Sequence, residues 1–352
     1  MTIHLVAAVS YAITSPEPAG DFDRYYAIAS AGGRPYIDYQ VEHPIATLAV
    51  LKAFALGRSR AAFGVEIVAL NAMCDVLILW SLATGWGLAA ALAYAVAVLP
   101  VIDLLFTRID AWSTAAATAG ALLWIRRRPA AAGAALAVGT AFKLWPLLLT
   151  PILAVPWRGR QSARAIGSFF LASAALAAPV WWIAGAASVR EVLTFRSATG
   201  WQIESTIGSL QNLFGVEAPR LENNAYRIGA LNGSLSIFLF AIGVPVCFWM
   251  MARAARASRI GDGWLASVSA LLLCSAVFSA QYVIWLTPGA AIALSDGSLL
   301  AAPLVVFSTT LTGAFMKAYG TVVDHGNVGW LDYRTAARAL VVIRNGLLLG
   351  LA

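Results

Sequence analysis

The sequence of 352 residues is 60% hydrophobic and only 12% charged, with a mean hydropathy of +0.77. Because a soluble domain carries roughly 25% charged residues, this composition excludes an ordinary soluble protein and indicates a polytopic membrane protein. The formal net charge of +7 does not indicate nucleic acid binding, since the arginines stand between apolar runs, as in cytoplasmic loops of membrane proteins. The three cysteines lie inside apolar runs without metal-ligand spacing, so neither a disulfide framework nor a zinc site is indicated.

We therefore predict one integral-membrane domain over residues 1–352, with an all-α, polytopic transmembrane helical bundle. At about 20 residues per span, the chain has room for about 10 to 14 membrane helices, some of them short or broken. The first apolar run, up to Thr14, is short for a span and could pass for a signal segment. No clean cleavage site follows it, so we expect a first helix. Three polar intervals are predicted to be outer loops: residues 15–43, 187–227 and 317–335.

The polar interval from Asp21 to Pro44 concentrates side chains that transfer protons or stack on rings, which plain loops seldom do. It contains the titratable groups of Asp21, Asp23, Asp38, Glu42 and His43 and the rings of Tyr25, Tyr26, Tyr36 and Tyr39. We interpret this interval as a catalytic outer loop. The alternative is a solvated connector whose aromatic rings lie at the level of the lipid head groups.

The positive-inside rule gives a first orientation of the chain. Arg58 and Arg60 follow the apolar run from Pro44 to Gly57, and the rule places them in the cytoplasm. The catalytic loop before that run would then lie outside.

The next apolar stretch, which ends at Arg108, is interrupted at residues 85–87 and at Pro100, a residue that breaks or kinks helices. These breaks favour three short crossings over one or two. Three crossings bring Arg108 and Asp110 to the outer face.

Residues 129–156 have the length of one span, yet arginines flank them at both ends. A broken hairpin of two short helices resolves this conflict, with Lys143 and Pro146 near its tip. A lysine at the bilayer centre costs roughly 3 kcal/mol and is a functional candidate by default. The alternative is a lysine at a helix end whose ammonium group reaches the head groups.

The second polar interval, residues 187–227, is rich in Ser, Thr, Gln, Asn and Trp, a composition that suits binding of sugar hydroxyls and rings. An amphipathic helix on the membrane surface is the competing interpretation. It is favoured by apolar residues at roughly helical spacing, namely Trp201, Ile203, Ile207, Leu210 and Leu213.

Four segments in a fixed order carry a family pattern. They are the loop Asp21–Pro44 with its Gly-Arg-Pro-Tyr-Ile-Asp and Glu-His-Pro runs, Arg108-Ile-Asp110, Lys143-Leu-Trp-Pro146, and Ser279-Ala-Gln-Tyr-Val-Ile-Trp-Leu-Thr-Pro288. Arg344-Asn345 near the C-terminus fits as well. Together these segments resemble the GT-C class of integral-membrane glycosyltransferases, and specifically glycosyltransferase family 87, which includes polyprenyl-phosphomannose-dependent mannosyltransferases.

The resemblance implies transfer of one sugar from a polyprenyl-phosphate donor to a lipid or glycan acceptor hydroxyl on the outer face of the cell membrane, with inversion. Mannose is the expected sugar, and glucose or arabinofuranose are alternatives. We expect no metal cofactor, because a phosphate monoester leaving group needs less help from a metal than a nucleoside diphosphate. The alternative is a divalent cation held between Asp21 and Asp110. The implied partners are the donor, the acceptor and membrane lipids, without nucleic acid.

The resemblance also implies a loop carboxylate that removes the proton of the acceptor hydroxyl. Asp21 is the first choice, because it matches the family's loop aspartate when Tyr25 sets the register. Asp23 is the competitor for this role. Asp38 and Glu42 would shape the loop or bind acceptor hydroxyls.

Fixed cations would stabilise the negative charge that gathers on the leaving phosphate. The resemblance implies this role for Arg108 and Lys143, with Arg196 as a third candidate. Asp110 would line the substrate site, or pair with Arg108 as a structural ion pair.

The remaining candidates lie in the C-terminal third. Gln281, Tyr282 and Trp285 would line the site of the donor head group, or else belong to an interfacial aromatic belt. His325 would accept a proton, or titrate in a solvated loop.

Two other classes of protein fit a polytopic bundle. One is a transporter or lipid flippase, since bundles with intramembrane charges also serve translocation. Against it, the ionisable groups gather at one face and no repeated halves are visible. The other is a non-catalytic relative of the family.

Overall fold

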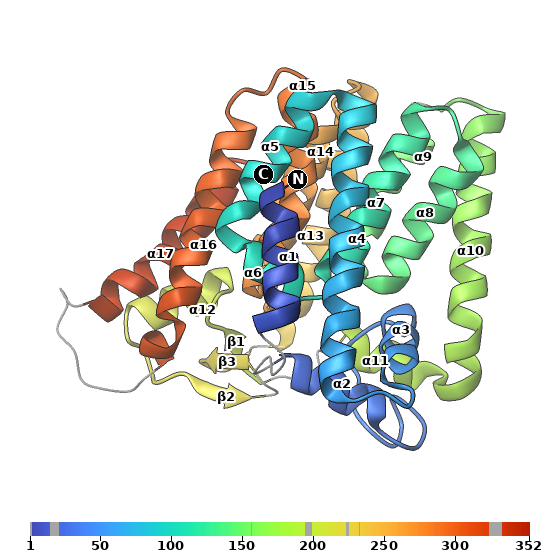
Figure 1. The fold of residues 1–352 in the computed structure, drawn as a ribbon. Coiled ribbons are helices and arrows are strands. Elements are labelled where there is room, and N and C mark those ends of the chain that lie inside the picture. Colours follow the sequence, from blue (N-terminus) through green and yellow to red (C-terminus); the bar gives the residue numbers. More distant parts are fainter. Residues whose placement is uncertain are drawn as a thin grey trace. The chain divides into compact units, whose positions relative to one another are not determined.

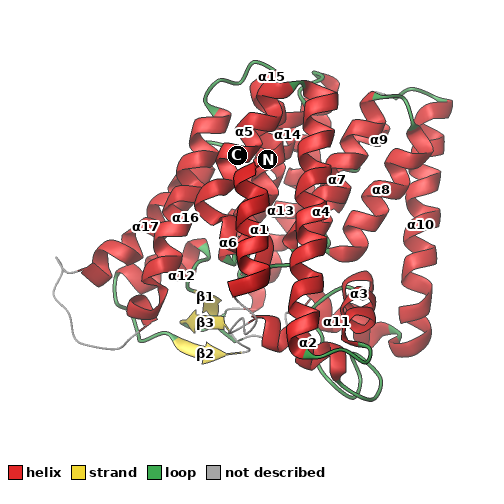
Figure 2. Cartoon of the chain, viewed as in Figure 1, coloured by secondary structure: helices red, strands yellow, loops and turns green. Residues whose placement is uncertain are grey.

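The structure is a computed structural model that describes residues 2–14, 21–155, 157–193, 199–222, 225–231, 233–323 and 333–352. The described chain is helical apart from a small three-stranded sheet (Figures 1 and 2). It forms two compact units. Unit 1 comprises Met1–Ala95 and Ile102–Ser197, and unit 2 comprises Val96–Val101 and Ala198–Ala352. Each unit is described by itself, and the single domain over the whole chain stays a prediction.

Helices make up unit 1 and its link to unit 2. They are α1 (Thr2–Thr14), α2 (Asp21–Ser30), α3 (Ile45–Ala55), α4 (Arg60–Trp86), α5 (Leu88–Val98), the 3-10 helix η1 (Leu99–Val101), α6 (Ile102–Thr107), α7 (Asp110–Ile125), α8 (Pro129–Phe142), the 3-10 helix η2 (Trp145–Leu149), α9 (Pro151–Ala154), α10 (Arg160–Ala184) and α11 (Ala186–Leu193).

Unit 2 continues with strands and helices. They are β1 (Trp201–Gln202), α12 (Thr206–Leu213), β2 (Arg220–Glu222), β3 (Ala225–Ile228), α13 (Gly233–Arg256), α14 (Ile260–Cys274), the 3-10 helix η3 (Ala280–Leu286), α15 (Thr287–Ser295), α16 (Ala301–Val323) and α17 (Tyr333–Leu349).

Five helical stretches of the described chain are long and apolar enough to cross a membrane. They are Arg60–Trp86, Leu88–Thr107, Arg160–Ala184, Phe238–Arg256 and Ala301–Tyr319. Five shorter apolar helices accompany them: Thr2–Ala12, Ile45–Ala55, Pro129–Phe142, Trp145–Ala154 and Ile260–Cys274. This set indicates a multi-pass membrane protein.

The stretch before Arg108 forms two long helices, so the prediction of three short crossings is wrong. α4 ends at Trp86 because Gly87 takes a φ of +94°, a conformation that L side chains rarely adopt. Pro100 lies in the single turn of η1, and the apolar helical stretch continues through it from Leu88 to Thr107. A proline near the middle of a span thus changes the helix type locally without ending the span.

The assignment of Arg58 and Arg60 to the face opposite the catalytic loop is also wrong. The 11 residues of α3 extend only about 16 Å, against an apolar bilayer core of about 30 Å. Arg60, after α3, pairs with Asp23, before it, and the Tyr26 hydroxyl donates to the carbonyl oxygen of Arg58 at 3.0 Å. Both ends of α3 therefore lie at the same end of α4, beside α2 and α11 (Figure 1). Because α3 does not cross the membrane, the arginines after it do not mark the opposite face.

Each of these two predictions counted one crossing too many. The errors therefore cancel, and the predicted sides of the segments that follow are unaffected. Arg108, at the end of the second long helix, pairs with Asp21, so it returns to the end of unit 1 that holds the catalytic loop. α7 then crosses to the other end of α4, where Arg126 Nη2 donates to the carbonyl oxygen of Thr84 at 3.0 Å. α8 comes back to Lys143, and η2 and α9 leave again. The broken hairpin predicted for residues 129–156 is therefore present in the structure.

The loop from Asp21 to Pro44, which we predict to be catalytic, is packed against protein. Tyr36 has a φ of +67°, its N–H donates to the carbonyl oxygen of Tyr39 at 3.0 Å, and its hydroxyl donates to that of His43 at 2.7 Å. The loop residues belong to an apolar cluster that includes the C-terminal part of α10: Ile28, Tyr36, Val41, Leu48, Val180 and Ala184. This burial gives the loop a fixed shape.

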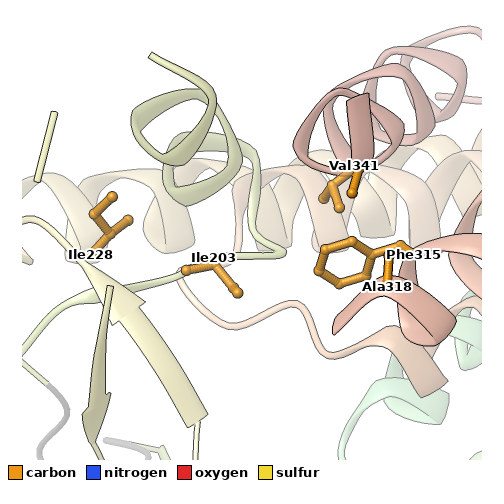
Figure 3. Close-up of a cluster of buried hydrophobic side chains, with 6 residues drawn as sticks. Ile203, Ile228, Phe315, Ala318 and Val341 are labelled. Carbon is orange, nitrogen blue, oxygen red and sulfur yellow. The ribbon is translucent and has the colours of Figure 1, made fainter. Parts of the chain in front are cut away.

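In unit 2 the sheet has the order β1-β3-β2 with antiparallel pairing, and Trp201 lies opposite Ile228. It packs on the neighbouring ends of α16 and α17 through Ile203, Ile228, Phe315, Ala318, Ala337 and Val341 (Figure 3). Only Thr206–Leu213 of the second polar interval forms the helix α12. A single amphipathic helix from Trp201 onward is therefore wrong.

Candidate active site

Asp21 begins α2, and its carboxylate faces two guanidinium groups. It pairs with Arg108, and Arg24 Nη1 lies 3.7 Å from Asp21 Oδ1. The three side chains are about one-fifth exposed, at 22% for Asp21, 21% for Arg108 and 18% for Arg24. An acidic side chain is also favoured in the first turn of a helix by the helix dipole. The carboxylate is thus fixed in position and still accessible.

Arg24 links Asp21 to the end of the catalytic loop. It pairs with Glu42, whose Oε1 lies 3.2 Å from His43 Nε2. The ring of His43 meets that of Tyr25 edge to face, with centroids 5.6 Å apart. The structure therefore gathers Asp21, Arg108 and Glu42 into one charged cluster, which we call the loop cluster.

The corner between α6 and α7 carries Arg108 and Asp110, and a buried amide holds it. Asn71, in the middle of α4, donates to the carbonyl oxygens of Phe106 at 2.8 Å and Arg108 at 2.9 Å, and accepts from Trp112 Nε1 at 2.7 Å. Carbonyl groups at a helix end have no partner within the helix, so Asn71 caps α6 from the side. Sequence reasoning did not select Asn71, although a polar amide inside a long apolar run is the usual signal.

Asp110 forms a buried ion pair with Lys143. The carboxylate is fully buried at the first residue of α7, and Lys143 Nζ lies 2.6 Å from Asp110 Oδ1 with its side chain 14% exposed. The Thr47 hydroxyl donates to the carbonyl oxygen of Phe142 at 2.7 Å, which ties the end of α8 to the segment after the catalytic loop. The Lys143 ammonium group thus contacts a buried carboxylate, which argues against the alternative in which it reaches the lipid head groups.

The other loop carboxylates have different surroundings. Asp23 is 49% exposed and pairs with Arg60. Asp38 lies 3.5 Å from Arg34 and accepts the Arg34 backbone N–H at 2.7 Å, a hydrogen bond that lowers the pKa of Asp38. A Cβ added at Gly33 would lie 3.0 Å from Asp38 Oδ2, so Asp38 closes a turn that needs glycine there.

In unit 2, Gln281, Tyr282 and Trp285 lie in η3. The rings of Tyr282 and Trp285 stack with centroids 4.1 Å apart and planes 17° apart, and the ring of Phe278 continues the stack at 6.5 Å from Tyr282. Trp285 is buried, whereas Gln281 and Tyr282 are half-buried. This aromatic stack offers a partly accessible edge. Arg196 and His325 lie outside the described residues.

The residues of the described chain include no group of three or more His, Cys, Asp and Glu side chains that could hold a metal ion. The two carboxylates considered as metal ligands, Asp21 and Asp110, each face a cationic side chain. Their surroundings therefore suit charge pairing within the protein.

Comparison with known proteins identifies the family of the chain. The model of glycosyltransferase family 87 matches residues 42–280, more than half of the chain, whereas none of the curated proteins compared matches the sequence. The matched range includes Arg108, Asp110 and Lys143, begins after Asp21 and ends before Gln281. With its apolar helices and this match, the chain belongs to glycosyltransferase family 87, a GT-C membrane family, and is a membrane glycosyltransferase.

Proposed function

We propose that this glycosyltransferase moves a single hexose, mannose by the family resemblance, from a polyprenyl-phosphate donor to a hydroxyl of a lipid or glycan acceptor. The reaction takes place at the outer face of the cell membrane and inverts the anomeric carbon. The observation that supports it most is the accessible carboxylate of Asp21, held between Arg24 and Arg108.

Asp21 acts as the general base. The acceptor oxygen attacks the anomeric carbon while its proton passes to the Asp21 carboxylate. The bond from the anomeric carbon to the phosphate oxygen breaks, and its electron pair leaves with polyprenyl phosphate. The exposure and single cationic neighbour of Asp23 support a structural role at Arg60 for that residue.

Cationic side chains stabilise the leaving phosphate. A guanidinium has five N–H donors in a planar fork, so Arg108 can pair with Asp21 through one edge and receive a phosphate at another. Lys143 provides a second charge near the same corner, and Asp110 is its positioning residue. Fixed cations of this kind act where negative charge develops in the transition state. They supply the charge that a metal ion would otherwise supply, so we expect a metal-independent reaction.

Within unit 2, Gln281, Tyr282 and Trp285 of η3 are the candidates for contact with the donor head group. The partly accessible edge of the aromatic stack at Tyr282 offers an apolar contact to the sugar, and the Gln281 amide binds hydroxyls. Glu42 of the loop cluster and the neighbouring His43 bind the acceptor. Arg196 and His325 remain candidates for the phosphate and for proton transfer.

The test is transfer of radiolabelled mannose from polyprenyl-phosphomannose to a lipid extract by membranes that carry equal amounts of each variant. We expect Asp21→Asn to abolish transfer, and Asp23→Asn and the control Asp38→Asn to retain it. Loss with Asp23→Asn alone would move the base by two residues. Absence of transfer by the wild type with mannose, glucose and arabinofuranose carriers would refute the proposed donor class.

A further inference from the structure

Unit 2 buries two oppositely charged side chains that the proposed reaction does not use. Glu204, between β1 and α12, is 3% exposed, and Arg344, in α17, is not exposed. The Glu204 carboxylate acts electrostatically on the Arg344 guanidinium. Burial of such a pair brings little stability, because replacement of both partners by neutral side chains of similar volume is often neutral or stabilising. The presence of this buried pair despite its small contribution to stability indicates a geometric role.

Arg344 fixes the chain at Glu204 from the side of α17. Its Nη2 donates to the carbonyl oxygen of Glu204 at 2.6 Å and to Asn345 Oδ1 at 2.9 Å. Asn345 Nδ2 in turn donates to the same carbonyl at 3.3 Å and to Ser209 Oγ at 3.1 Å. The preceding residue, Ile203, packs on α16 and α17 (Figure 3). Apolar and polar contacts together hold this segment in place.

Both charged residues also reach the segment that leads into η3. Glu204 Oε2 accepts from Gln202 Nε2 at 2.7 Å, and the same amide nitrogen donates to Ser279 Oγ at 3.0 Å. The guanidinium of Arg344 lies 3.9 Å from the centre of the Phe278 ring. Phe278 is the first ring of the aromatic stack, and Ser279 is the residue before η3.

We infer that Glu204 and Arg344 are positioning residues for the donor sugar, and that the Ser279 hydroxyl belongs to the sugar-binding edge beside Tyr282. This inference rests on the proposed function, in which the aromatic stack binds the hexose of the donor. Ser279 is half-buried and next to the stack, and the Gln202 amide holds its hydroxyl in place. The buried pair holds the residues on which this edge is built, and it touches no substrate itself.

The chemistry of arginine explains why this residue is present at position 344. A guanidinium stacks on a ring and donates in its own plane at the same time, whereas a lysine ammonium is a point charge that cannot do both. Arg344 uses both properties, at Phe278 and at the Glu204 carbonyl. Arg344→Lys should therefore fail as a conservative replacement.

The test compares Arg344→Lys, the double variant Glu204→Gln/Arg344→Met and Ser279→Ala with the wild type. Arg253→Met is the matched control, because Arg253 also lies over a ring, that of Trp249, but is exposed on α13. For each of the three test variants we expect a rise of roughly tenfold in the KM for polyprenyl-phosphosugar, a small change in kcat and an unchanged acceptor KM. The control Arg253→Met should keep the wild-type values. The thermal unfolding midpoint of the double variant in detergent should stay close to that of the wild type.

An unchanged donor KM in the folded double variant would overturn the inference while leaving the proposed function intact. Equal changes in donor KM, acceptor KM and kcat, with a lower unfolding midpoint, would also overturn it. A wild type that uses no polyprenyl-phosphosugar would refute the proposed function first, and the inference with it.

Discussion

Replacement of Lys143 tests whether the charges at the α6–α7 corner serve folding or catalysis. Lys143→Met leaves the fully buried Asp110 carboxylate without the ammonium that now lies 2.6 Å away. Removal of one partner of a buried ion pair costs about 3–5 kcal/mol. The carboxylate sits at the N-terminus of α7, whose dipole offsets about 0.3–1 kcal/mol. Lys143 is also slightly exposed, so we expect the lower end, about 3 kcal/mol of unfolding free energy.

The second replacement, Asp110→Asn in the Lys143→Met background, removes the uncompensated charge. We expect this double variant to return to within about 1 kcal/mol of the wild type, a recovery of about 2 kcal/mol relative to Lys143→Met. Sugar transfer should not return with stability. Without Lys143 the leaving phosphate loses a fixed cation, and loss of one such charge costs on the order of a hundredfold in kcat.

Two measurements on each variant decide the matter: equilibrium unfolding in detergent micelles, and transfer from the polyprenyl-phosphosugar at saturating donor. A double variant no more stable than Lys143→Met would refute the charge-pair account of the corner. A stable double variant that transfers sugar at the wild-type rate would remove Lys143 from the catalytic machinery. The single replacement Asp110→Asn should lose less stability than Lys143→Met, because Lys143 can turn toward solvent.

Three further predictions concern the frame around the site. Asn71→Leu, which keeps the branched shape but leaves two carbonyls and an indole N–H without their partner, should cost about 2–4 kcal/mol and lower kcat; unchanged kcat would contradict its role at the corner. Gly133→Ala should cost about 1–3 kcal/mol, because its Cβ would lie 2.0 Å from the Ala165 carbonyl oxygen, whereas the control Gly167→Ala, with nothing within 4 Å, should be neutral or stabilising. EDTA should leave transfer unchanged, and inhibition that Mg²⁺ or Mn²⁺ reverses would revive a metal site at the two carboxylates.

Composition and spacing predicted the all-α polytopic bundle, and the family resemblance is confirmed. The broken hairpin at Lys143 followed from arginines at both of its ends. The same reasoning failed at Arg58 and Arg60. A positive-inside argument requires that the apolar run between two loops crosses the membrane, and the 11 residues of α3 are too few for a crossing.

The small sheet of unit 2 was beyond sequence reasoning for a physical reason. Its strands have two to four residues, too few for an alternating pattern to stand out, and their pairing joins residues such as Trp201 and Ile228 across a long connection. Glu204 lies in a polar interval, where a carboxylate attracts no notice. Only its burial beside Arg344 distinguishes it from a solvated side chain. Asn71, by contrast, stood out in an apolar run and could have been selected.

Three cations of the described chain share one arrangement. Asp21 faces Arg108, Asp110 faces Lys143, and Glu204 acts on Arg344, so each cation has an anion of the protein nearby. A cation that awaited its phosphate alone in an apolar setting would pay the full cost of desolvation. A carboxylate partner offsets part of that cost. In the function proposed above, Arg108 keeps Asp21 at one edge of its guanidinium and receives the donor phosphate at another. The ion pair then holds the proposed base and the proposed anion-binding group within reach of each other.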